Sequence, residues 1–203
     1  MIRTGLTLLE TLLALCITSV IGIAIAALMA ATTDSLSSKD DGRSTAILLA
    51  TAQIRLGAYI APSLCVLDKR DNKIALWFED RQANNTVNVS EVRWILFDNE
   101  AKLLAVKFVD FPTDWSQAMI EAADYECNLL SDYDSILSAF ESSEHITTVP
   151  LVDSIETCHF WINQLNPIEA TRISMRFSLM SKFGVTKDSV IDESIRLHVT
   201  PAQ

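Results

Sequence analysis

The sequence opens with MIRTG followed by LTLLETLLALCITSVIGIAIAALMAA, and these residues 1–31 decide which fold can follow. The first five residues carry one cation, Arg3, and end at Gly5. Between positions 6 and 31 the only charged side chain is that of Glu10, and there is no proline. A helix of this length would measure roughly 39 Å, which exceeds the about 30 Å of a hydrocarbon core. The pattern predicts a leader over 1–5 and a transmembrane helix over 6–31.

A secretory signal peptide is a poorer interpretation of the same segment. In a signal peptide the small-residue cleavage site follows the apolar region. Here the small residue, Gly5, precedes the apolar run, and the residues after it (TTDSLSSKDD, 32–41) contain no A-x-A site. The cation Arg3 on the short side predicts a cytoplasmic N-terminus by the positive-inside tendency.

The residues Gly5-Leu6-Thr7-Leu8-Leu9-Glu10 resemble the prepilin processing motif shared by type IV pilins and type II secretion pseudopilins. The resemblance implies that prepilin peptidase cuts after Gly5, that Leu6 becomes the N-methylated new N-terminus, and that Glu10 is the characteristic acid. The sequence departs from the motif with Leu6 where phenylalanine is usual. It also has Ala27 where many major pilins carry a helix-kinking proline, which favours a minor-subunit role.

The resemblance implies an α+β fold in which a long N-terminal transmembrane-plus-amphipathic helix packs on an antiparallel β-sheet head. The expected parts are the leader 1–5, a filament-core helix 6–31, an amphipathic continuation 32–62 and a globular head 63–203. The strands of the last third are similar in order and spacing to those of minor pseudopilins of the J kind. The implied location is the bacterial inner membrane, single-pass, with a periplasmic head.

The implied function is that of a minor pseudopilin, a structural subunit of a type II secretion-type machine that assembles into a short periplasmic filament. Its expected partners are prepilin peptidase, other pilin-like subunits, an inner-membrane assembly platform and membrane lipid. A type IV pilus or DNA-uptake minor pilin is the first alternative, and a signal-anchored envelope enzyme or binding module is the second.

A role for Glu10 follows from the helix geometry. Glu10 lies only about 6 Å along the helix from Leu6, so in an isolated subunit its carboxylate reaches water. Within a bundle of helices the charge would be desolvated and would need a partner. Cleavage after Gly5 would create one, because the amine of Leu6 on an adjacent subunit is a cation. We therefore expect Glu10 to set the register of assembly.

The chain carries no recognisable catalytic motif. It lacks G-x-S-x-G, a P-loop, a dinucleotide-binding glycine pattern, H-E-x-x-H and C-x-x-C. Cys158 and His159 are adjacent on an expected strand, where neighbouring side chains point to opposite faces. We expect no enzyme activity and no cofactor. Asp132-x-Asp134 lacks the glycine and terminal glutamate of an EF-hand, so we expect a solvated acidic helix face and no metal site.

Charge and cysteine content restrict the possible partners further. The net charge is −10, which makes nucleic-acid binding improbable because that requires a basic face. Twelve acids and no Lys or Arg occur between Lys107 and Arg172, and they either face water or meet cations from elsewhere. Outside the apolar segment Cys65, Cys127 and Cys158 allow at most one intramolecular disulfide, and the sequence leaves open whether it forms.

Periodicity predicts the elements of the head. A break at 35–42 is followed by a helix over 43–60, in which Ile47, Ala50, Ile54 and Ala58 recur at three or four residues. Strands are expected at 64–67, 73–79, 91–97, 102–109, 155–162, around 172–179 and at 193–199. A helical insert is expected at about 116–142, as helices at 116–130 and 132–140. Trp77, Trp94 and Trp161 lie on expected strands and are assigned to sheet packing.

Overall fold

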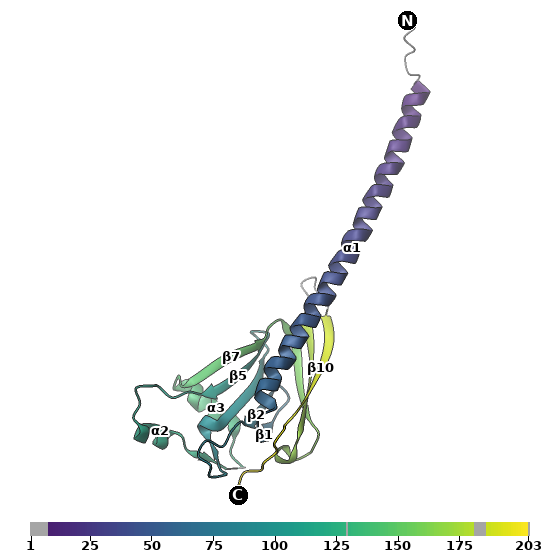
Figure 1. Ribbon diagram of the computed structural model, residues 1–203. Helices are drawn as coiled ribbons and strands as arrows, with labels where there is room; N and C mark the ends of the chain where they lie inside the picture. The colour runs from purple at the N-terminus through teal and green to yellow at the C-terminus, as the bar shows by residue number, and fades with distance from the viewer. Residues whose placement is uncertain (1–7, 129, 181–185, 203) are drawn as a thin grey trace. The chain divides into compact units, whose positions relative to one another are not determined.

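The computed structural model describes the backbone of residues 8–128, 130–180 and 186–202; within the first helix it describes side chains at 12–13, 15–30, 43 and from 46 onward. The chain divides into two compact units, Met1–Ser44 and Thr45–Gln203. Helix α1 (Leu8–Ile60, 53 residues) includes residues of both (Figure 1). The second unit, called the head below, is an α+β domain of antiparallel strands.

The predicted transmembrane helix is wrong. Among the residues that the structure describes, no helical stretch is long and apolar enough to cross a membrane. The predicted fold class is therefore wrong in its transmembrane helix. The predicted single-pass inner-membrane location is wrong for the same reason.

The predicted break at 35–42 is also wrong, because the backbone of this segment is helical. Its serines and aspartates each cost only a fraction of a kcal/mol in a helix relative to alanine. Gly42 is the strongest helix breaker among these residues, at about 1 kcal/mol. No proline occurs between Leu8 and Ile60, so nothing in the segment forces the helix to end. Pro62 follows closely after Ile60, the last helical residue.

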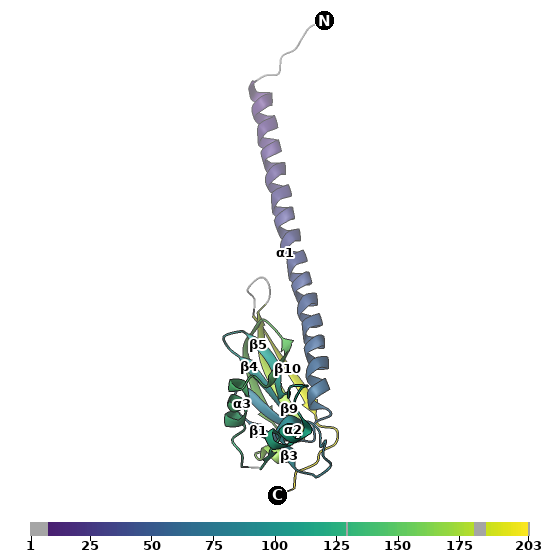
Figure 2. The ribbon, with the colours of Figure 1, turned by 90° about the vertical axis from the view of Figure 1, so that its left-hand side faces the viewer.

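A five-stranded antiparallel sheet forms the centre of the head. Its strand order is β1-β2-β4-β5-β7. Figures 1 and 2 show several of its strands from two directions. The strands are β1 (Cys65–Lys69), β2 (Lys73–Trp77), β4 (Val92–Asp98), β5 (Leu103–Val109) and β7 (Ile146–Val152). A hairpin joins β4 to β5, and the Asp98 carboxylate accepts hydrogen bonds from the backbone N–H groups of Glu100 and Ala101.

The central sheet is buried on both faces, and the alternation of side chains along each strand divides them between two cores. On β2, Ile74 and Leu76 join one core while Ala75 and Trp77 join the other. The first core contains the inner residues of α1 and of a second sheet. The other core contains the apolar residues of α3 (Tyr133–Ser142).

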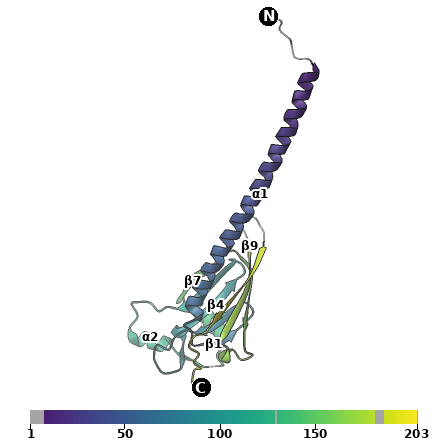
Figure 3. The same ribbon diagram turned by 45° about the vertical axis from the view of Figure 1, so that its right-hand side comes forward.

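The second sheet has three antiparallel strands in the order β10-β9-β8 (Figure 3). The strands are β8 (Ile155–Ile162), β9 (Arg172–Met180) and β10 (Thr186–Ser194). The predicted bounds of β8 are confirmed. The predicted alternation on β9 is confirmed too, because Ile173, Met175, Phe177 and Leu179 are buried in the first core.

Two expectations for this sheet are wrong. Trp161 is 46% exposed, because Cys158 and Phe160 occupy the inward positions of β8 and leave Trp161 on the outer face. The strand predicted at 193–199 extends too far, because β10 ends at Ser194. Ser194 pairs with Arg172, the first residue of β9. The chain then leaves the sheet, and the N–H of Arg196 donates to the carbonyl of Ala61 at 3.0 Å.

The expected insert contains two helices, but the first is shorter than predicted. Helix α2 (Gln117–Ala123) has Ser116 as its N-cap, and α3 has Asp132. Between them β6 (Glu126–Cys127) pairs with β3 (Val87–Asn88), which ends the predicted helix at 116–130 early. Figure 2 shows α2 and α3 at the surface of the head. Two 3₁₀ turns, η1 (Val89–Glu91) and η2 (Pro167–Glu169), complete the elements.

Candidate functional site: the outer stripe of helix α1

Helix α1 has two apolar stripes within the head. The buried stripe consists of Ala52, Leu56 and Ile60, which recur every four residues and lie in the first core. The stripe noted in the sequence, Ile47, Ala50, Ile54 and Ala58, faces outward and is called the outer stripe here. Ile54 is 73% exposed and Leu56 is 0% exposed. Side chains two positions apart on a helix differ in direction by about 200°, so Ile54 and Leu56 point to opposite sides of α1.

A groove of about 670 Å³ runs beside the outer stripe. One wall is formed by the end of α1 and the loop after it, and the other by the end of β10 and the segment that follows it. The lining residues are Gln53, Ile54, Gly57, Ala58, Ala61, Pro62, Glu193, Arg196 and Leu197. A Cβ atom added at Gly57 would lie 3.5 Å from the Glu193 carboxylate, so Gly57 lets this side chain lie close to the helix.

The groove has the chemistry of a packing surface. Its side chains are mostly apolar or small, and Glu193 and Arg196 are the charged residues in its lining. It contains no histidine, cysteine or serine that could act as a nucleophile or a base. Small residues at Gly57, Ala58 and Ala61 permit close approach of another helix, with which Ile54 and Leu197 could pack. Sequence reasoning missed the second wall because it placed residues 193–199 in a strand.

The residues predicted to be processed cannot be located. Gly5 and Leu6 lie outside the described residues. The backbone of Glu10 belongs to helix α1, but its side chain lies outside the described part of the chain. The cleavage, methylation and register roles of these residues stay predictions.

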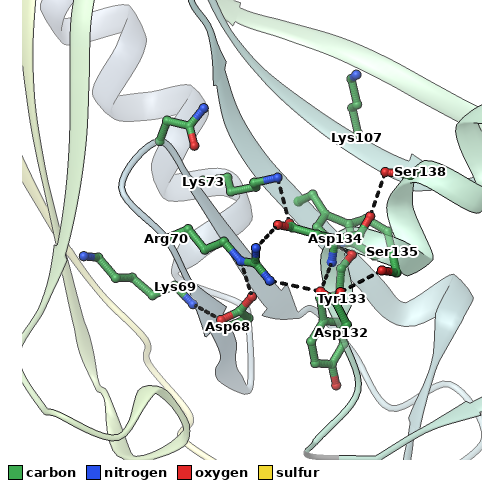
Figure 4. A network of polar contacts seen from close by, with 12 residues as sticks. Asp68, Lys69, Arg70, Lys73, Lys107, Asp132, Tyr133, Asp134, Ser135 and Ser138 are labelled. Carbon is green, nitrogen blue, oxygen red and sulfur yellow. Dashed lines mark hydrogen bonds and ion pairs between the residues drawn. The ribbon is translucent and has the colours of Figure 1, made fainter.

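An ionic network fastens the insert to the central sheet (Figure 4). Arg70, in the turn between β1 and β2, donates to the Asp132 carboxylate at 2.9 Å and forms an ion pair with Asp134. The Nζ of Lys73 lies 2.7 Å from the same Asp134 carboxylate. The predicted solvated acidic helix face is therefore wrong for these two carboxylates, because both are paired with cations of the same chain. In the described residues no group of three or more potential ligands could hold a metal ion.

Asp132 also caps α3. The Ser135 hydroxyl donates to its carboxylate at 2.7 Å, the backbone N–H of Asp134 donates at 3.2 Å, and Arg70 lies beside it. Together these contacts hold the pKa of Asp132 below its ordinary value of 3.8. A carboxyl group whose pKa is lowered on folding stabilises the folded state above its unfolded pKa, and this contribution is lost as the pH falls through the folded pKa.

We expect Asp132→Ala to lower the thermal midpoint of the chain by a few degrees at pH 7, because it removes both the cap and the ion pair. Asp132→Asn keeps a capping oxygen and should cause a smaller loss. The difference between the parent and either variant should shrink as the pH falls below about 4. Thermal melts across this range measure it, and a difference that is independent of pH would contradict a charge-based role.

Two buried charged groups are satisfied within the head. Glu91 accepts hydrogen bonds from the Trp77 indole at 3.1 Å, the Arg81 N–H at 2.7 Å and the Asn88 N–H at 3.1 Å. The Arg93 guanidinium lies between the rings of Phe78 and Phe108, at 4.9 and 4.6 Å from their centroids. Both groups thus meet partners within the head and serve the fold.

The cysteines do not form a reactive site. Cys65, Cys127 and Cys158 are buried free thiols, so the disulfide left open by the sequence is not formed. Burial raises the pKa of each to about 12, which keeps the unreactive thiol form at neutral pH. Cys158 is buried and His159 is exposed, which confirms that their side chains point to opposite faces.

Comparison with known proteins gives no match. No protein-family model, no curated protein and no solved structure is significantly similar to this chain.

Proposed function

We propose that this chain is a pilin-like structural subunit of a type II secretion-type machine, assembled into a short filament through contacts of its N-terminal helix. In this proposal a prepilin-type peptidase cuts between Gly5 and Leu6, and the new N-terminus is methylated. The amine of Leu6 then pairs with Glu10 of an adjacent subunit and sets the register. The partners are other pilin-like subunits.

The observation that carries the proposal is the exposed outer stripe of α1 beside its groove. A helix that only packs on its own domain needs one apolar stripe, and the buried stripe already meets that need. The outer stripe places two large residues, Ile47 and Ile54, in solvent on the opposite side. Burying such side chains gains roughly 1.5–3 kcal/mol each, which is a favourable term for assembly.

The first unit supports the same interpretation independently. The described part of its helix exposes ten large apolar side chains at positions 12, 13, 15, 17, 20, 21, 23, 25, 28 and 29. They occur on every side of the helix rather than along one stripe. A helix that is apolar all round is stable when it is surrounded. Neighbouring helices of the same kind in a filament would provide that environment.

We expect Ile54→Asp to reduce assembly at least tenfold while leaving the fold intact. An ionised carboxylate placed in an apolar interface costs several kcal/mol, and each 1.4 kcal/mol corresponds to a factor of ten in association. At an exposed helix position the same change alters stability only slightly. The fraction of full-length protein cross-linked into high-mass species in the native cell measures assembly.

The matched control is Val190→Asp on β10, which introduces the same charge at a position that is 58% exposed and lies outside the groove. It should leave the cross-linked fraction unchanged. If Ile54→Asp assembles as well as the parent, the outer stripe is not an assembly surface.

A further inference from the structure

Five rings form a connected group on the insert side of the head. The Phe111 ring stacks on Trp115 at 5.7 Å between centroids and meets Phe140 at 6.3 Å. Tyr125 also stacks on Phe140, at 6.2 Å between centroids. Trp115 in turn meets the imidazole of His145 edge-on at 4.8 Å. We call these five residues the aromatic cluster.

The cluster is anchored at one point and open elsewhere. Phe140 is buried in the core beneath α3, whereas Tyr125 is 46% exposed and the other rings are partly exposed. Helix α2 connects Trp115 to Tyr125, and none of its residues is buried. Its Met119 is 50% exposed.

An acid lies next to every ring of the cluster in the sequence. The pairs are Asp110 with Phe111, Asp114 with Trp115, Asp124 and Glu126 with Tyr125, Glu141 with Phe140, and Glu144 with His145. Three of these acids accept hydrogen bonds within the chain. Thr147 donates to Asp110, Ser90 to Asp124 and Lys107 to Glu141. The side chains of Asp114, Glu126 and Glu144 have no hydrogen bond or ion pair with any described residue.

None of these three carboxylates forms an ion pair with a cation in the part of the chain that the structure describes. Residues 108–171 contain no Lys or Arg. Lys107, at the edge of this region, is already paired with Glu141 at 2.5 Å. The surface therefore combines partly exposed rings with three carboxylates that have no ion-pair partner in the described residues, a combination complementary to a cation that can also stack.

We propose that the aromatic cluster with Asp114, Glu126 and Glu144 docks an arginine-bearing extended segment of a partner protein. The guanidinium group fits both features, because it stacks on aromatic faces and donates paired hydrogen bonds to a carboxylate. Lysine offers the charge without the planar stacking surface and binds more weakly here. The proposal does not depend on the outer stripe or on the assembly proposed above.

The test uses the full-length chain and a fluorescent synthetic peptide of alternating glycine and arginine. Binding is measured by anisotropy at about 50 mM and about 500 mM NaCl, because exposed charge pairs are screened within about 10 Å at moderate salt. Peptides with lysine or with glutamine in place of arginine are the ligand controls. The protein variants are Asp114→Asn, Glu126→Gln and Glu144→Gln combined, and Tyr125→Leu.

A second triple variant, Glu100→Gln with Asp153→Asn and Glu169→Gln, matches the change in net charge at exposed positions outside the cluster. We expect the first triple variant to weaken arginine-peptide binding about tenfold and the matched variant to weaken it less than about twofold. Tyr125→Leu should remove the preference for arginine over lysine. Equal weakening by both triple variants would show attraction to net charge alone and would overturn the proposal. Equal binding of the glutamine peptide, or no binding at low salt, would overturn it as well.

Discussion

Leu56→Ala is expected to lower the free energy of unfolding of the head by about 2–5 kcal/mol, whereas Ile54→Ala two residues earlier should change it by about 0.5 kcal/mol or less. Leu56 is fully buried in the core between α1 and the two sheets, and its truncation would leave a cavity in a close-packed interior. Ile54 lies on the outer stripe and loses little contact with its own domain.

Urea unfolding of the full-length chain, followed by a signal from the buried Trp77 and Trp94, measures both values. The comparison is well matched, because both variants replace a large aliphatic residue with alanine in the same helix. Similar losses in the two variants would mean that the outer stripe is also buried, which would contradict the description of α1. An unchanged midpoint for Leu56→Ala would contradict the position of the first core.

The periodicity of α1 shows what sequence could and could not predict. It correctly indicated a helix over the residues before Pro62, because apolar residues recur at helical spacing. It did not identify the buried side, because Leu48, Ala52, Leu56 and Ile60 recur as regularly as the outer stripe. Two apolar stripes on one helix can be distinguished only when the residues packed against them are known.

The strands, like helix α1, were predicted correctly from the sequence only in part. The period-two pattern of β9 predicted its buried face correctly, because one face of this strand lies on the first core. The same pattern continued at 195–199, where the neighbouring strand has ended and the chain turns towards Ala61. Strand β7 was missed, since it contains Pro150. That proline is tolerated because β7 is an edge strand.

The candidate surfaces were only partly foreseeable. The excess of acids between Lys107 and Arg172 was visible in the sequence, but which of them are balanced was not. Asp132 and Asp134 meet Arg70 and Lys73, which lie about sixty residues earlier in the chain. No spacing rule links such distant residues. The aromatic cluster was missed for the same reason, since Phe140 lies on α3 and the other four rings lie in the segments between helices and strands.

Gly5→Val is expected to abolish removal of the leader, whereas Thr4→Val in the same leader should leave removal intact. This prediction follows from the resemblance of residues 5–10 to the prepilin processing motif, in which a small glycine precedes the cut bond. A branched side chain at that position would obstruct the peptidase at the scissile peptide. The two variants introduce the same residue one position apart, so the contrast isolates the glycine from any general effect of leader hydrophobicity.

The central claim, that the chain is a processed pilin-like subunit, is tested most directly by the intact mass of the protein isolated from its native cell. The account predicts a chain that begins at Leu6, lacks Met1–Gly5 and carries one additional methyl group at its N-terminus. A native protein that retains residues 1–5 would contradict the account.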